Sequence, residues 1–278
     1  MSTGEDRMRR GVLYPQRLPE FHRLMPPDDL VHALSWFWIP EWDLPDGQRS
    51  VQQLLPFPAC NIVVEGDTVS AVGPPTVRSE RVLAGSGWAV GALLRPAAAR
   101  LLICDLAGVG DLADLRDSAR PLEEPALQRA VAGAMSDAVA EPGARRAAAA
   151  EAFAEWIRSR VPDPGHGSEG TLANELAVAI ADPSVIRVSD LEVRLHASTR
   201  TLQRIAARFF GLSPHSMIRR RRLQEAAERL REDSGLPIAR IATELGYADH
   251  AHFSSDFKAL LGVTPSAYRE SAGLAHDH

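Results

Sequence analysis

The first hundred residues alternate short apolar runs with turn-forming residues. Proline, glycine and acidic residues bound four such runs, at Gln52–Leu55, Asn61–Val64, Val69–Val72 and Trp88–Leu94. Short apolar runs between turn signals are typical of β-strands. The pattern predicts a β-rich sandwich or barrel that extends to about residue 108.

From about Glu124 onward the apolar residues recur at helical spacing. They fall in two stretches separated by Glu141-Pro142-Gly143: Leu127, Val131, Ala134 and Ala138, and then Phe153, Trp156, Ile157 and Val161. The two stretches predict a helical hairpin that ends at residue 161. The second stretch is either core of this region or a dimerisation surface, and the spacing fits both.

Residues 162–167 read Pro-Asp-Pro-Gly-His-Gly, a composition typical of a linker. We therefore expect a linker over residues 162–171, between a sensing or dimerisation domain of residues 1–161 and a second domain of residues 172–272.

The second domain contains an internal repeat. Leu191 and Leu195 recur as Ile241 and Leu245 at an offset of 50 residues. After a turn the offset becomes 51, and the matched pairs are Leu202 with Phe253, Ala206 with Phe257, Gly211 with Gly262 and Pro214 with Pro265. Each copy has a helical pattern, a short break, a second helical pattern and a glycine stop. This order is that of a helix-turn-helix unit, so the expected fold class is α+β with an all-α, double helix-turn-helix second domain.

The second helix of the first unit, Thr199 to Phe210, has two chemically distinct faces if Ser198 is its N-cap. One face is apolar, with Leu202, Ile205, Ala206 and Phe209; the opposite face carries Arg200, Gln203, Arg204 and Arg208. Arginine forks and amides match the edges of guanine and adenine in the major groove. This helix is therefore the predicted recognition helix of the first unit.

One continuous helix, from Pro214 to about Glu232, is predicted to join the two units. At 1.5 Å per residue it spans roughly 27 Å, which suits two recognition helices about one DNA turn apart. The run Arg219 to Arg222 lies near its start, where some guanidiniums are expected to face phosphate and others to pack or pair.

The second unit lacks the forked donors of the first. At the offset of 51, Arg200, Gln203, Arg204 and Arg208 become Ala251, Ser254, Ser255 and Ala259. His250, His252 and Lys258 remain as candidate base or phosphate contacts. We therefore expect base discrimination mainly in the half-site bound by the first unit.

Charge is distributed unevenly along the chain. Residues 1–183 hold 17 basic and 25 acidic side chains, whereas residues 184–278 hold 14 and 11. Nine arginines against two acidic residues lie between Arg187 and Arg222. Such an imbalance is typical of a surface that binds phosphates.

Residues from about Leu172 to Tyr268 resemble the DNA-binding domain of the AraC/XylS family of bacterial regulators. The resemblance is strongest in the second copy, over the segments 238–247, 252–254 and 257–258 and the closing segment 262–269, GVTPSAYR. It implies a seven-helix, two-lobed domain whose helices at 199–210 and 250–261 enter successive major grooves, with Arg200, Gln203 and Arg204 as base readers. The full set of predicted DNA contacts is Ser198, Arg200, Thr201, Gln203, Arg204, Arg208, His250, His252, Ser254, Ser255 and Lys258.

Two residues depart from the family pattern. Glu192 stands where the family usually has a small residue under the turn, and we expect it to loosen the first unit locally. Ser255 stands where an arginine is frequent, which weakens base readout by the second unit. The segment from Leu55-Pro56-Phe57-Pro58 to Arg95-Pro96 is similar to N-terminal domains of some actinobacterial members, which implies a ligand-sensing or dimerising module.

Other function classes fit the sequence less well. An enzyme would need a catalytic constellation, but the first domain shows no nucleophile elbow, phosphate loop or dinucleotide signature. His22 and His32, expected on a turn and a helix, make no metal site, so we expect no cofactor. Cys60 and Cys104 fit two reduced core thiols. A nucleoid-like protein would explain the arginine excess but not the forked donors.

The expected partner is double-stranded promoter or operator DNA. RNA polymerase, a second copy of the chain and a small-molecule effector are the other candidate partners. No window approaches eighteen uncharged apolar residues, so we expect a cytoplasmic protein that does not enter a membrane.

Overall fold

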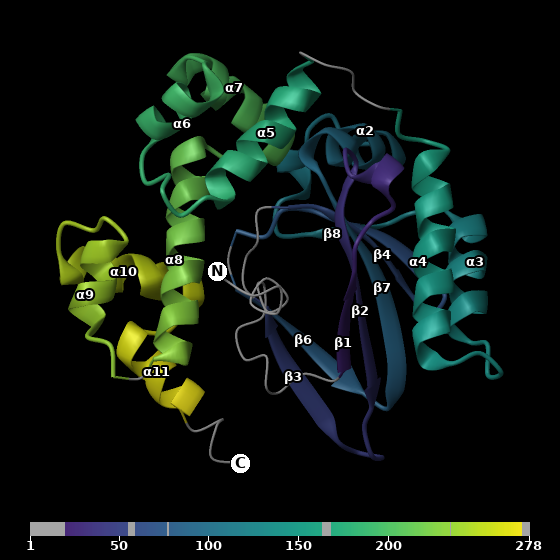
Figure 1. Ribbon diagram of the computed structural model, residues 1–278. Helices are drawn as coiled ribbons and strands as arrows, with labels where there is room; N and C mark the ends of the chain where they lie inside the picture. The colour runs from purple at the N-terminus through teal and green to yellow at the C-terminus, as the bar shows by residue number, and fades with distance from the viewer. Residues whose placement is uncertain (1–19, 55–58, 77, 163–167, 234, 274–278) are drawn as a thin grey trace.

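The computed structural model describes residues 20–54, 59–76, 78–162, 168–233 and 235–273. The fold is α+β, with a β-rich N-terminal half and an all-helical C-terminal half (Figure 1). This confirms the predicted fold class. The segment Leu55–Pro58 lies outside the described residues.

The N-terminal half is built on a six-stranded antiparallel sheet with the order β1-β2-β7-β4-β5-β8. Its strands are β1 (Glu20–Leu24), β2 (Leu34–Asp43), β7 (Ser86–Leu94), β4 (Asn61–Glu65), β5 (Thr68–Val72) and β8 (Ala119–Pro121). A two-stranded antiparallel ribbon, β3 (Arg49–Leu54) with β6 (Ser79–Ala84), completes it. All four predicted runs lie in strands over their described residues. The expected positions of the two histidines are wrong, because His22 lies in β1 and His32 lies in the turn after the 3-10 helix Asp28–Leu30.

The predicted helical hairpin is present, and it packs against the sheet. It consists of α3 (Pro125–Met135) and α4 (Pro142–Arg158), each with a proline in its first turn. Alternate residues of the central strands, such as Ile62 and Val64 of β4, are buried in the same core as the predicted stripe, Phe153, Trp156 and Ile157 of α4 and Val161 just after it. That stripe is therefore core, and it offers no dimerisation surface.

Helix α2 (Pro96–Leu106) follows β7 and lies next to α5 (Glu169–Ala181) of the C-terminal half (Figure 1). The 3-10 helix η3 (Leu112–Leu115) comes after α2 and contacts α7 (Thr199–Phe210). In this part of the molecule α2 packs against the first helix of the C-terminal half. The two halves are thus in contact through α2 and η3.

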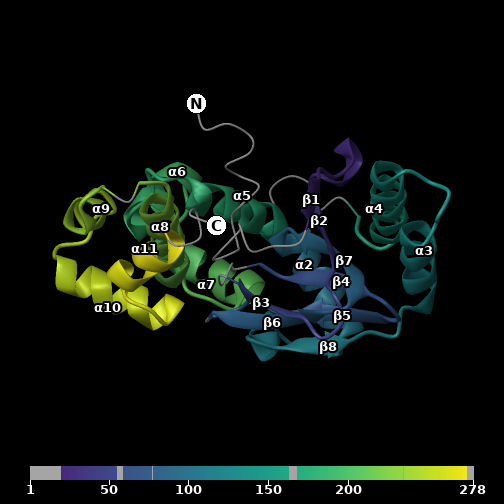
Figure 2. The same ribbon diagram turned by 90° about the horizontal axis from the view of Figure 1, so that it is seen from below.

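The described part of the C-terminal half contains seven helices: α5 (Glu169–Ala181), α6 (Val188–Leu195), α7 (Thr199–Phe210), α8 (Pro214–Glu232), α9 (Ile238–Glu244), α10 (His250–Leu261) and α11 (Pro265–Gly273). The predicted ranges of α7, α8 and α10 are confirmed. Helix α8 runs between two helix-turn-helix units, α6–α7 and α9–α10, which lie toward its opposite ends (Figure 1). In the view along α8, α9 and α10 lie on one side of it and α7 on the other (Figure 2).

The expected linker is shorter than predicted at its C-terminal end. Helix α5 starts at Glu169 because the Ser168 hydroxyl accepts a hydrogen bond from the Thr171 backbone N–H at 3.1 Å. Residues 163–167 of the expected linker lie outside the described residues. In the described residues no helix is long and apolar enough to cross a membrane.

Candidate nucleic-acid interface

The turn of each helix-turn-helix unit contains a residue in the left-handed conformation. His196 has a φ of 49° in the first unit, and Gly246 has a φ of 75° at the equivalent position, 50 residues later. Glycine adopts this conformation without a steric penalty, whereas histidine does not. The repeat found in the sequence therefore extends to the backbone of the turn.

Two oxygen acceptors cap the recognition helix α7 of the first unit. The Ser198 hydroxyl accepts a hydrogen bond from the Thr201 N–H at 3.2 Å, as the predicted N-cap should. The Glu192 carboxylate accepts one from the Thr199 N–H at 2.7 Å and another from the Thr199 hydroxyl. A carboxylate is favourable at a helix N-terminus. The expectation that Glu192 loosens the first unit is therefore wrong, because this side chain ties α6 to the start of α7.

The two predicted faces of α7 are present. Leu202, Ile205, Ala206 and Phe209 are buried, and the predicted DNA contacts Arg200, Gln203, Arg204 and Arg208 are exposed. In the described part of the chain, no hydrogen bond or ion pair engages the side chains of Arg200 and Gln203. These two donors are free to meet a ligand.

Arg204 and Arg208 are held by a carboxylate that the sequence interpretation missed. Glu169, the first residue of α5, accepts from Arg204 through one oxygen and from Arg208 through the other. The hydrogen bond from Arg204 is the main reason that the pKa of Glu169 is lowered. Glu169 lies within the expected linker, 35 residues before Arg204, and no local pattern marks the pairing.

The recognition helix α10 of the second unit exposes weaker donors. Asp249 caps it by accepting from the His252 N–H at 2.7 Å. His250, Ser255 and Lys258 are exposed, and Ser254 is half-buried with its hydroxyl 3.5 Å from His250 Nδ1. No forked donor lies on this exposed face, as the sequence predicts.

Asp256 gathers several partners at the base of α10. It accepts two hydrogen bonds from Arg219, both at 2.7 Å, and lies 3.3 Å from the Tyr247 hydroxyl. Burial, with Asp256 nearby, raises the pKa of Tyr247 to about 12 and keeps it a neutral donor. His252 Nε2 is 3.7 Å from the same carboxylate, so this predicted DNA contact is partly engaged within the unit. The sequence held a signal for Asp256, because the repeat pairs it with the buried Ile205.

The arginine run at the start of α8 is occupied by intramolecular partners. Arg219 pairs with Asp256, Arg220 donates to the Pro75 carbonyl at 2.8 Å, Arg221 pairs with Glu225, and Arg222 lies over the Tyr247 ring at 4.2 Å. Burial lowers the pKa of Arg220. The packing and pairing part of the prediction is thus confirmed for all four residues, and the expected phosphate contact stays a prediction.

The N-terminal half contacts the C-terminal end of α7 and the neighbouring α5. Arg100 of α2 donates to the Arg208 carbonyl at 3.1 Å, and Arg116 donates to the Gly211 carbonyl. Asn174 of α5 donates to the His32 carbonyl at 2.9 Å and accepts from the Ala97 N–H at 3.1 Å. Side chains and backbone groups of both halves thus position the first unit.

A cavity of about 520 Å³ lies at this junction. Ala98 and Leu101 of α2, Val161 at the end of the first half and Phe209 of α7 supply apolar wall, while Arg100 and His32 are polar. His32 Nε2 is buried and has no hydrogen-bond partner within the described residues. The cavity is bounded by both halves of the chain.

Two protein families match separate parts of the chain. A helix-turn-helix domain family matches residues 191–271, which include the second unit and all of the first except the start of α6. A domain of unknown function, DUF6597, matches residues 22–114. The C-terminal match agrees with the geometry of the two units.

Relatives of the chain are regulators of transcription. The HTH-type transcriptional activator AarP from Providencia stuartii is 31% identical over 105 residues, covering 37% of this chain and 77% of AarP. The probable transcription factor PqrA from Proteus vulgaris is 36% identical over 77 residues, covering 28% of this chain and 62% of PqrA, less than two thirds of it. Among solved structures, the apo form of a ToxT variant from Vibrio cholerae matches 84% of this chain and 96% of its own, with 12% identity and a TM-score of 0.43.

Proposed function

Because the chain belongs to the AraC/XylS family of DNA-binding transcription regulators, we propose that it binds promoter DNA with α7 and α10 in two successive major grooves. The observation that carries this proposal is the exposed donor face of α7, where Arg200 and Gln203 have no partner in the described part of the chain. Helix α8 has 19 residues and spans roughly 28 Å, a length suited to recognition helices about one turn apart.

Methylation interference on duplexes selected from a random-sequence library tests this function. Methylation of guanine N7 blocks the major groove, so we expect two clusters of interference on one face of the DNA, centred about 10 base pairs apart. A single cluster, or interference confined to the minor groove, would contradict two-groove binding. Binding without any preferred site would instead favour a nucleoid-like role.

The predicted DNA contacts have different roles in this proposal. Arg200, Gln203 and Arg204 contact bases. Ser198 and Thr201 at the N-terminus of α7, together with Arg208, contact phosphate. In the second unit the contacts come from His250, His252, Ser254, Ser255 and Lys258, mainly to the DNA backbone.

Control of DNA binding is assigned to the N-terminal half. Support comes from its contacts with α5 and α7 and from the mainly apolar cavity at the junction, a volume typical of small-molecule sites. Asn174→Ala removes two hydrogen bonds between the halves, and loosening α5 in this way should raise DNA affinity. Unchanged affinity in the full-length variant would contradict control through this junction.

Residues 1–161 and 172–272 are proposed as the two domains, with RNA polymerase as a protein partner at the promoter. The DNA-binding fragment should begin at Ser168 rather than at residue 172, because α5 starts at Glu169 and contributes to the core of the first unit.

We assign the chain no catalytic role, in line with its relatives, and we place it in the cytoplasm, where the chromosome lies. With the hydrophobic stripe of α4 buried, no surface for a homodimer is assigned.

A further inference from the structure

The two helix-turn-helix units have separate hydrophobic cores. One cluster contains buried residues of α5, α6 and α7, and the other contains those of α9, α10 and α11. In the described part of the chain α8 is the helix that contributes to both, with Met217 and Ile218 in the first and Leu223, Ala226 and Leu230 in the second. The angle between the units therefore depends on α8 and on the polar contacts that link it to each unit.

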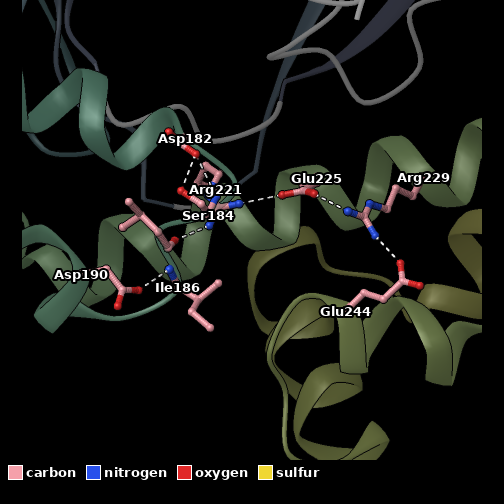
Figure 3. Close-up of polar contacts among 9 residues, drawn as sticks. Asp182, Ser184, Ile186, Asp190, Arg221, Glu225, Arg229 and Glu244 are labelled. Atoms are coloured by element: carbon pink, nitrogen blue, oxygen red, sulfur yellow. Dashed lines mark hydrogen bonds and ion pairs between the residues drawn. The ribbon is translucent and has the colours of Figure 1, made fainter. Parts of the chain in front are cut away.

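A continuous chain of polar contacts passes along α8 from one unit to the other (Figure 3). Arg221 donates to the Val185 carbonyl and to Glu225, both at 2.6 Å. The other oxygen of Glu225 accepts from Arg229 at 2.6 Å, and Arg229 donates to Glu244 of α9 at 2.8 Å. Arg221, Glu225 and Arg229 are spaced by four residues, so they share one face of the helix.

Glu225 is the central residue of this chain of polar contacts. Its side chain is 17% exposed and that of Arg221 is 12% exposed, so solvent screens the pair only partly. Each carboxylate oxygen binds a different arginine, and those arginines lead to different units. Removal of the charge would leave the half-buried Arg221 without the carboxylate that pairs with it, and Arg229 without the residue that holds it on this face of α8.

Both ends of this chain of polar contacts are anchored in rigid parts of the units. Val185 is buried, and the loop around it is held by Asp182, which accepts from the Ser184 N–H at 2.9 Å, and by Asp190, which accepts from the Ile186 N–H at 2.9 Å (Figure 3). At the other end Glu244 belongs to α9, the first helix of the second unit. The contacts therefore connect folded elements rather than mobile side chains alone.

We propose that Glu225 is a positioning residue that fixes the angle between α7 and α10 and thereby restricts the half-site spacing that the protein accepts. The inference rests on the proposed two-groove binding. One inserted base pair rotates one half-site relative to the other by about 34° and moves it by about 3.4 Å. Units held at a fixed angle cannot follow this change, whereas units freed from the polar chain can follow part of it.

The test compares full-length wild type with Glu225→Gln on three duplexes: a selected site and the same site with one base pair inserted or deleted between its half-sites. Glutamine keeps the size of the side chain, but its amide nitrogen cannot accept from an arginine. Wild-type affinity should fall about tenfold on either altered spacing. For Glu225→Gln the affinity should fall only about threefold or less on the altered spacings, because the freed units can follow part of the change.

Arg240→Gln is the matched control. It removes an exposed ion pair to the same Glu244 within the second unit. The polar contacts that connect the two units along α8 stay intact. Its spacing penalty should equal that of the wild type. A merely structural role of Glu225 would lower affinity on all three duplexes in proportion, without changing the ratio between them.

An equal spacing penalty in Glu225→Gln and wild type would overturn the inference. If circular dichroism shows that Glu225→Gln does not fold, Arg229→Gln, which breaks the chain at its more exposed arginine, replaces it under the same criterion. Failure of the proposed function would be visible in the wild type itself, as equal binding to all three spacings or to one half-site alone. The two failures are thus distinguishable.

Discussion

Glu169→Gln should strengthen DNA binding. In the free protein this carboxylate accepts from Arg204 and Arg208, two of the predicted DNA contacts of α7. Bases and phosphates must compete with it for the two guanidiniums, and its negative charge also repels the DNA backbone. Glutamine retains the size of the side chain but removes the charge, so both arginines become available to DNA.

The expected gain is modest because all three side chains are well exposed. Arg204 is 54% exposed, Arg208 is 48% exposed and Glu169 is 39% exposed. Exposed ion pairs contribute little each, so the affinity for a selected duplex should rise roughly two- to tenfold. The pKa of Glu169 is lowered, so the carboxylate is charged at neutral pH and the gain should be independent of pH above about 6.

Fluorescence anisotropy with a labelled selected duplex measures this gain in full-length protein. Glu175→Gln is the control, because it makes the same charge change on an exposed residue of α5 that has no arginine partner in the described part of the chain. The difference between the two variants should shrink at high salt, which screens exposed pairs. Equal affinities of the two variants at low salt, or weaker binding by Glu169→Gln, would refute the competition.

Phe253 is fully buried and contacts the Tyr247 ring, so Phe253→Ala should lower the free energy of unfolding by about 3–5 kcal/mol in urea denaturation. A loss below about 1 kcal/mol would contradict the assigned core. Burial raises the pKa of Cys60 to about 12, so iodoacetamide at pH 8 should label it only after unfolding, while the half-buried Cys104 reacts slowly in the native protein. Lys258→Ala should weaken binding to all duplexes alike and reduce the salt dependence by about one counterion, and a change in base preference would show that Lys258 contacts bases.

The helices of the DNA-binding half could be predicted from the sequence because their signals are local. Ser198 caps α7, Gly211 ends it in a left-handed conformation, and Pro214 starts α8. The division of α7 into apolar and donor faces follows from helical periodicity alone. Strand β2 was harder to predict, because Pro40 interrupts a run in which most residues are apolar on both faces.

Pairings between distant side chains were not predictable from the same signals. Glu169 reaches Arg204 because α5 packs beside α7, and no pattern at either residue indicates this. The family pattern favours a small residue in place of Glu192, but the effect of this side chain depends on its hydrogen bonds to Thr199. Asp256 was the recoverable case, because a carboxylate opposite a buried isoleucine in a repeat signals a polar partner in the second unit.

The central claim is that the two units contribute unequally to sequence recognition. Selection of bound sites from random DNA, by wild type and by Arg204→Ala, tests it most directly. Exposed forked donors lie on α7 and not on α10, and a bidentate donor discriminates by roughly 1–3 kcal/mol per base pair. We predict that sequence information is concentrated in the half-site bound by α7 and that Arg204→Ala loses preference at one or two of its positions. Equal information in both half-sites, or a preference unchanged by Arg204→Ala, would contradict the account.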